Sequence, residues 1–243
     1  MDEVKRMYFL IVLICFFALT GCSQDSSGSE KVLSYQENNE IIGEEREEIV
    51  GEVSDTMYES IDRSNTEAEE IVIGPVSGDG EEIIPPEGRY SIGMGFDGSP
   101  QSGRVLVYDE EGILLIEALL DGSYGVGSIT VDLNGSHTVY VDGVDELILI
   151  PEETNISNEL TAGISEVGKD IEPGNYSVVT DLDSGMGYME IFEEGEQPKV
   201  FEILIDPLEP DIDVELKEGQ KVKITGLYGL YALQFEPQPS RSE

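Results

Sequence analysis

Apart from carboxylates, this sequence has few side chains that could take part in acid–base, nucleophilic or metal chemistry. Its 243 residues include one histidine, His137, and two cysteines, Cys15 and Cys22. A zinc site, or a nucleophile activated by histidine, needs several such side chains close together. His137 stands alone at a polar position of a strand pattern, so we expect a histidine on the surface rather than a metal ligand.

The 52 Asp and Glu residues form many pairs, and a pair of carboxylates could serve a glycosidase as acid and base. In so acidic a chain such pairs arise by chance. The chain has no tryptophan and only 7% aromatic residues, whereas sugar-binding clefts usually stack sugar rings on aromatic side chains. We therefore expect no enzymatic activity, no catalytic residue and no cofactor, with a carboxylate-dependent hydrolase as the weakest alternative.

Acidic loops could supply oxygen ligands to calcium. Residues 181–185 begin like a calcium loop, but the twelfth position is Phe192, where an EF-hand has glutamate. Residues 97–98 and 142–146 are similar acidic turns. Solvated turn residues are the simpler interpretation, so we assign no metal site. We expect weak calcium binding by the whole acidic surface, and a calcium-responsive surface protein is the alternative function.

The charge of the chain restricts its partners. Its formal net charge is −39, from 13 Lys and Arg against 52 Asp and Glu. Nucleic acids and anionic lipid surfaces are bound by basic side chains that displace counterions from phosphates. The composition therefore argues against nucleic-acid binding and favours a partner with a basic or neutral face, such as an extracellular protein or an envelope component.

The N-terminus has the pattern of a secretion signal. Two basic residues at 5–6 precede an apolar run over residues 7–19, which is shorter than the about 20 residues needed to span a bilayer. The run leads into Leu-Thr-Gly-Cys at residues 19–22 and then into a polar stretch. An uncleaved membrane anchor, or an ordinary signal peptide followed by a chance cysteine, are the alternative interpretations.

The Leu-Thr-Gly-Cys motif resembles the lipobox of bacterial lipoproteins, with Cys22 as the residue that accepts the lipid. The resemblance implies removal of the signal peptide, residues 1–21, and attachment of a diacylglycerol to Cys22. Acyl chains such as palmitate would then hold the protein on the extracytoplasmic side of the cell membrane. Cys15 leaves with the signal peptide, so the mature chain has no intramolecular disulfide.

Residues 22–70 are polar and acidic, with Glu-Glu-Arg-Glu-Glu at 44–48. Such a composition buries too little apolar surface to offset the entropy of ordering, so we expect a disordered, flexible acidic tether. Apolar residues between 42 and 61 also recur at helical spacing. They predict a helix over residues 44–61 as a second interpretation, acting as a spacer or as a docking helix.

From residue 71 onwards the chain contains two copies of one pattern. Residues 129–133 (ITVDL) match 212–216 (IDVEL), and residues 88–91 (GRYS) match 174–177 (GNYS). Both copies consist of short runs of alternating apolar and polar residues, interrupted by Gly, Pro and Asn. We predict an all-β fold with two tandem homologous domains, each a small sandwich or a partly open barrel. The first covers 71–152, the second 158–238, and a tail follows at 239–243.

In the second copy, the pattern predicts a hairpin between residues 212–216 and 221–224. The apolar residues are in phase when Val214 pairs with Val222, and this register places Asp213 opposite Lys223 on the solvent face. A loop at 217–219 with glycine in its third position suits such a turn.

The segment VGKDIEPGNY, residues 167–176, resembles a "VGKDIxPGxY" module found in secreted and lipid-anchored proteins of Gram-positive bacteria. The resemblance implies an extracellular β-domain and brings no catalytic residues with it. Its Pro-Gly-x-Tyr sequence is typical of a turn that leads into a strand, and we expect Tyr176 to pack inward. These features together favour a non-catalytic, lipid-anchored binding or envelope-associated protein of the cell surface.

Overall fold

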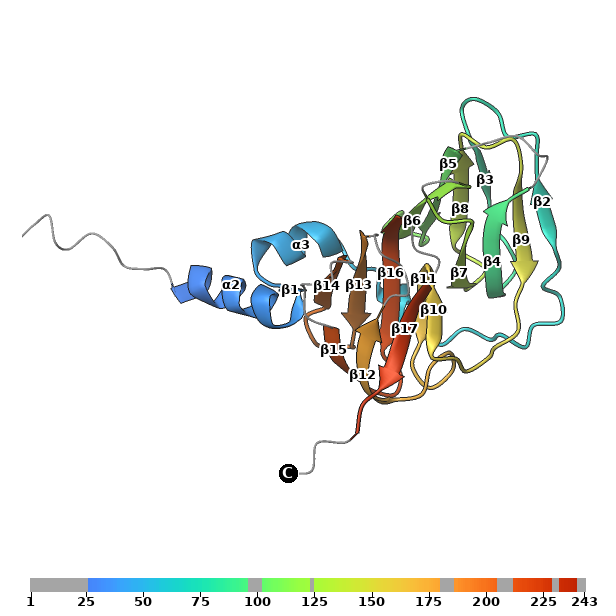
Figure 1. Cartoon of the computed structure of the whole chain (residues 1–243). Helices are drawn as coiled ribbons and strands as arrows, with labels where there is room; N and C mark the ends of the chain where they lie inside the picture. Colours follow the sequence, from blue (N-terminus) through green and yellow to red (C-terminus); the bar gives the residue numbers. More distant parts are fainter. Residues whose placement is uncertain are drawn as a thin grey trace, which may run out of the picture.

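The computed structural model describes residues 26–95, 102–122, 125–179, 186–204, 212–228 and 232–239 (Figure 1). Four short elements come first: α2 (Ser26–Asn38), β1 (Glu40–Ile41), α3 (Glu44–Val50) and the 3-10 helix η1 (Asp55–Tyr58). All the elements that follow them in the described residues are strands. The predicted all-β fold is confirmed.

The strands fall into two sets, which we call the first and the second module. The first module consists of β2 (Ile71–Ile73), β3 (Glu81–Ile83), β4 (Gly88–Met94), β5 (Ser102–Tyr108), β6 (Leu114–Asp121), β7 (Ser128–Leu133), β8 (Thr138–Asp142) and β9 (Leu147–Pro151). The second module consists of β10 (Glu159–Thr161), β11 (Gly163–Glu166), β12 (Gly174–Val179), β13 (Met186–Phe192), β14 (Lys199–Leu204), β15 (Ile212–Leu216), β16 (Lys221–Tyr228) and β17 (Ala232–Pro237).

Both modules have the same strand order. The first contains the sheets β2-β9-β4-β7 and β3-β8-β5-β6, and the second contains β10-β17-β12-β15 and β11-β16-β13-β14. Counted from one to eight within each module, the orders are 1-8-3-6 and 2-7-4-5, which is the strand order of a jelly-roll sandwich. Equal orders are what a tandem repeat would produce. That the two modules are homologous domains stays a prediction.

The two modules share one sheet. β7 pairs in parallel with β11 through Thr130 and Gly163, and this joins four strands of each module, with β1 beyond β14, into a nine-stranded sheet. The backbone N–H of Thr130 donates to the carbonyl of Ala162 at 3.0 Å. Gly163 has φ +137°, and a Cβ atom there would overlap the carbonyl oxygen of Thr130. The close approach of the two strands therefore requires glycine at this position.

The core lies between the sheets of each module. Tyr90 of β4 and Tyr176 of β12 occupy matching positions and are 0% and 4% exposed. The ring of Tyr176 packs edge-on against Phe235, with 5.9 Å between the ring centroids. Its hydroxyl donates to the carbonyl of Glu172 at 2.8 Å. The prediction that Tyr176 packs inward is confirmed.

The predicted hairpin between β15 and β16 is wrong. β15 pairs with β12, whereas β16 pairs with β11 and β13, so the loop between them crosses from one sheet to the other. Lys223 consequently lies beside Glu190 of β13 and not opposite Asp213. Strands that face each other across a sandwich have the same alternation as strands that are hydrogen-bonded neighbours. The period alone could not distinguish the two arrangements.

The expectation of a disordered tether is also wrong for the segment 39–70, which we call the linker. Met57 and Ile61 are 6% and 7% exposed, and β1 pairs with β14 at the edge of the large sheet. A few apolar residues are enough to order the linker, because they pack on surfaces that the two modules already provide. The acidic side chains meanwhile stay in solvent.

The helix predicted over residues 44–61 is confirmed only in its first part. α3 ends at Val50, where Gly51 follows with φ +65°. The chain then turns into η1, whose first N–H groups are capped by the side chain of Ser54, which accepts from Thr56 at 3.1 Å. Apolar residues after the glycine are buried by contact with the modules and not by continuing the helix.

Candidate functional site

The linker and both modules meet at four buried charged side chains, which we call the junction cluster: Arg63 of the linker, Arg89 of β4, Asp132 of β7 and Asp170 between β11 and β12. Arg63 donates to Asp132 at 2.7 Å and to Asp170 at 2.8 and 2.9 Å. Arg89 lies 3.1 Å from an oxygen of each aspartate. None of the four side chains is more than 11% exposed, so the charges compensate one another away from bulk water.

The protonation of Arg63 follows from these contacts. Burial by itself would lower the pKa of Arg63, but its hydrogen bonds to Asp170 and Asp132 outweigh burial and raise the pKa above the usual range. The guanidinium group therefore keeps its charge. Its planar fork can satisfy two carboxylates at once, which a lysine ammonium could not match in geometry.

Lysines of the second module hold the segment just before Arg63. The ammonium of Lys221 donates to the carbonyl of Glu59 at 3.1 Å and to the carboxylate of Glu166 at 2.6 Å. The ammonium of Lys169 donates to the hydroxyl of Ser60 at 3.0 Å. The linker is thus fixed to the second module by direct polar contacts as well as to the first.

The second module repeats the strand framework on which Arg63 is bound. Arg89 pairs with Asp132 between β4 and β7, and Asn175 pairs with Glu215 at the same register position between β12 and β15. In both modules, this pair is preceded along the first strand by a Gly–Leu pair and followed by a Tyr–Val pair. The repeated motifs that the sequence analysis identified are therefore neighbouring strands in the same register.

The chain that follows the last strand of each module also takes the same path. In the first module the N–H of Glu152 donates to the carbonyl of Arg89 at 2.9 Å. In the second the N–H of Gln238 donates to the carbonyl of Asn175 at 2.8 Å. The two positions can therefore be compared residue by residue.

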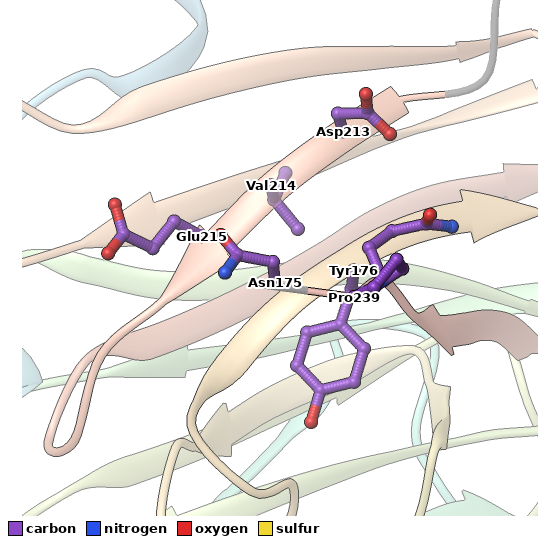
Figure 2. A pocket seen from close by; sticks show the side chains of 7 residues that line it. Asn175, Tyr176, Asp213, Val214, Glu215 and Pro239 are labelled. Carbon is purple, nitrogen blue, oxygen red and sulfur yellow. The ribbon is translucent and has the colours of Figure 1, made fainter. Parts of the chain in front are cut away.

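In the second module this position is an open hollow of about 370 Å³, which we call the Glu215 hollow (Figure 2). Its lining residues are Asn175, Tyr176, Asp213, Val214, Glu215, Gln238 and Pro239. Figure 2 shows the carboxylates of Asp213 and Glu215 on one strand and Asn175 on the neighbouring strand, with the ring of Tyr176 directed away from the carboxylates. Asn175, Asp213 and Glu215 are exposed.

The charges of the two positions differ. Glu215 keeps the carboxylate of Asp132, but Asn175 stands in place of Arg89 and Asp213 in place of Thr130.

Among the described residues, no Lys or Arg lies within ion-pair distance of Asp213 or Glu215. Lys217 is two residues along the chain from Glu215, but its ammonium pairs with Glu193 at 3.0 Å. The Lys217 ammonium still interacts electrostatically with Glu215, so among the described residues the hollow holds two carboxylates that have no ion-pair partner.

The edge of β15 next to the hollow is capped by α2. The side-chain amide of Asn38 accepts from the N–H of Asp213 at 2.7 Å and donates to the carbonyl of Asp213 at 2.9 Å. Thr130, at the matching position of β7, is instead bound by the backbone of the second module at Ala162. A side chain thus satisfies in β15 the backbone groups that pair with another strand in β7. Asn38 does not line the hollow, which stays open on the outer face of the sheet.

A second hollow, of about 640 Å³, lies between the end of α3, β6 and the outer face of β13 and β16. It contains Glu190, which is 2% exposed and whose pKa is raised by burial, while Lys223 acts in the opposite direction. The ammonium of Lys223 is 2.9 Å from Glu190 and 5.3 Å from the ring centroid of Phe192. This contact is an ion pair without the angles of a good hydrogen bond. Lys223 therefore compensates the buried carboxylate of Glu190, and the other carboxylates that line this hollow, Glu48, Glu52 and Glu117, lie at its rim.

His137 is not on the surface, contrary to the sequence-based expectation. It is 2% exposed and its Nε2 atom lies 3.1 Å from the hydroxyl of Thr56 in η1. Burial lowers the pKa of His137, and the nearby carboxylates of Glu59 and Asp109 only partly oppose this. Because the linker that covers His137 was expected to be disordered, the burial of this histidine could not be predicted.

The other residues singled out in the sequence have varied positions. Cys22 and the acidic loops at 97–98 and 181–185 lie outside the described residues. In the remaining loop, Asp142 pairs with Arg104. Within the described ranges no group of three His, Cys, Asp or Glu side chains is arranged to hold a metal ion, and no described helix is long and apolar enough to cross a membrane.

Arg63 and Glu215 were not among the functional residues predicted from the sequence. A signal for Glu215 was present, since the matched motifs align Asp132 with Glu215 and Arg89 with Asn175 and so show a carboxylate without its arginine. No signal marked Arg63, a basic residue in an acidic segment. Comparison with known proteins gives no further guide, because no family, characterised protein or solved structure matches the chain.

Proposed function

We propose that this protein is a non-catalytic binding protein of the cell surface, anchored through lipid on Cys22, whose second module presents the Glu215 hollow to a partner. The observation that carries the proposal is the contrast between the modules. The first module fills its position with Arg63 from the same chain, and the second leaves the matching position open with its carboxylate retained.

The charge of the chain and the N-terminal motif support the same function. A net charge of −39 disfavours contact with anionic membranes and walls, so the modules would extend away from them and a partner would present a basic face. The junction cluster fixes the linker to both modules. The hollow itself lies on the hydrogen-bonded strands β12 and β15, so little backbone ordering would accompany binding.

Cell fractionation tests the anchoring. We expect the wild-type chain, expressed in a Gram-positive host, in the membrane fraction, accessible to protease added to intact protoplasts and resistant to a high-salt wash. Cys22→Ser should be released into the medium or should accumulate as an unprocessed precursor. Cys15→Ser is the matched control and should behave as the wild type. A processed Cys22→Ser protein that stays on the membrane would contradict the proposal.

Calcium titration distinguishes this function from that of a calcium-responsive protein. Diffuse attraction by carboxylates gives weak binding without saturation at physiological ionic strength. A stoichiometric micromolar site, together with a rise in melting temperature, would instead favour the calcium-responsive function.

A further inference from the structure

We infer that the Glu215 hollow binds the guanidinium group of an arginine side chain on a partner protein. This inference rests on the proposed binding function and specifies its partner. The guide is the chain itself, because the corresponding position of the first module contains the guanidinium of Arg63, bound to the carboxylate that matches Glu215.

The correspondence is of structure and not only of sequence. The strands β4 and β7 pair in the same register as β12 and β15, and the chain leaving each module bonds to the same carbonyl position. Asp132 and Glu215 therefore project from the same outer face at the same place. Two acidic side chains on a surface are by themselves weak evidence for a binding site. Here, however, the carboxylate at the matching position, Asp132, binds a guanidinium group in the same molecule.

The substitutions in the second module suit a guanidinium that comes from outside. Asn175 in place of Arg89 removes the cation that would neutralise Glu215, and Asp213 in place of Thr130 adds a second carboxylate. A guanidinium group donates two parallel hydrogen bonds to one carboxylate and has further N–H groups for a neighbouring acceptor. The side-chain carbonyl of Asn175 can serve as that acceptor.

The chain that leads into the second module cannot supply the cation. Arg63 lies just ahead of the first module, but residues 152–158, just ahead of the second, read Glu-Glu-Thr-Asn-Ile-Ser-Asn and contain no basic residue. The edge of β15 is closed at Asp213 by Asn38. A partner therefore inserts its arginine from the outer face of the sheet and does not add a strand at the edge.

Titration of the full-length chain in an uncharged detergent, followed by amide resonances in two-dimensional NMR, tests the inference. The probe is N-acetylarginine amide, and N-acetylcitrulline amide is its uncharged control of the same shape. We expect saturable shifts confined to the amides around Asn175, Glu215 and Gln238 with the arginine probe. The citrulline probe should cause none, because it lacks the charge that strengthens these hydrogen bonds.

Three variants make the test specific. Glu215→Gln should weaken arginine binding at least about tenfold. Glu236→Gln, on the same sheet face but outside the lining, should leave it unchanged. Asn175→Arg should abolish probe binding and raise the melting temperature, because it recreates the pair of Arg89 with Asp132. This last variant keeps the test valid if Glu215→Gln folds poorly.

Three results would overturn the inference. Equal weakening by Glu215→Gln and Glu236→Gln would show general attraction by an acidic surface. Shifts of the same amides on Arg241→Ala, without any probe, would show that the tail of this chain fills the hollow. If the hollow does not bind the arginine probe while the fractionation of Cys22→Ser gives the expected result, only the inference of arginine binding is wrong. If the titration shows arginine binding but the fractionation does not give the expected result, the proposed lipid anchoring is wrong instead.

Discussion

The guanidinium of Arg63 and the carboxylate of Asp170 form a two-point ion pair, with N–O distances of 2.8 and 2.9 Å, between residues 107 positions apart in the chain. The same guanidinium binds Asp132 of the first module. Since one side chain connects three parts of the molecule, its removal is the most direct test of how the linker is held.

Arg63→Ala should lower the free energy of unfolding by about 3–5 kcal/mol, because it leaves two buried carboxylates with only Arg89 to compensate them. Urea denaturation measures the loss, and limited proteolysis should show earlier cleavage in residues 39–62. Arg104→Ala is the control, since Arg104 is half exposed in its pair with Asp142 and its loss should cost at most about 1 kcal/mol. Equal losses in both variants would show that the junction cluster does not stabilise the fold.

Gly163→Ala should destabilise the contact between the modules, because the added Cβ would overlap the backbone of Thr130. We expect a loss of more than about 2 kcal/mol by urea denaturation, with faster amide exchange at Thr130. Gly195→Ala, at φ +81° with no neighbour near the new Cβ, measures the cost of positive φ alone. A Gly163→Ala protein as stable as Gly195→Ala would contradict the close packing of β7 and β11.

The stability of the protein should depend on pH through His137. Burial depresses the pKa of His137 in the folded state below its ordinary value of 6.5, so the unfolded chain binds more protons near and below that pH. Stability should therefore fall as the pH drops below about 6.5. In His137→Gln this part of the pH dependence should disappear, as unfolding in urea at a series of pH values would reveal. Identical slopes for both proteins would mean that His137 is accessible to solvent.

Asn38→Ala should expose the backbone of Asp213 at the edge of β15. Both hydrogen bonds of the Asn38 amide would be lost, at a cost of about 1 kcal/mol, and the Asp213 amide should exchange faster with solvent. Asn38→Asp keeps one acceptor and should give an intermediate exchange rate. Unchanged exchange in Asn38→Ala would show that α2 does not cap this edge.

The sequence by itself determined the strands and their repetition. Alternating apolar residues identify the matched strands 129–133 and 212–216, because one face of each is buried and the other is not. The inward position of Tyr176 followed from another local pattern, the Pro-Gly-x-Tyr turn that leads into its strand. The charge and the N-terminal motif likewise depend only on composition and residue order.

Only the tertiary structure decided which strands are neighbours and where the acidic linker goes. The local pattern of β15 and β16 fits a hairpin as well as a crossing between sheets, and long-range pairing with β12, β11 and β13 selects the crossing. Arg63 and His137 look like surface residues in the sequence. Their burial depends on contacts with residues far away in the chain, such as Asp170 and Thr56, which a reading of local order cannot supply.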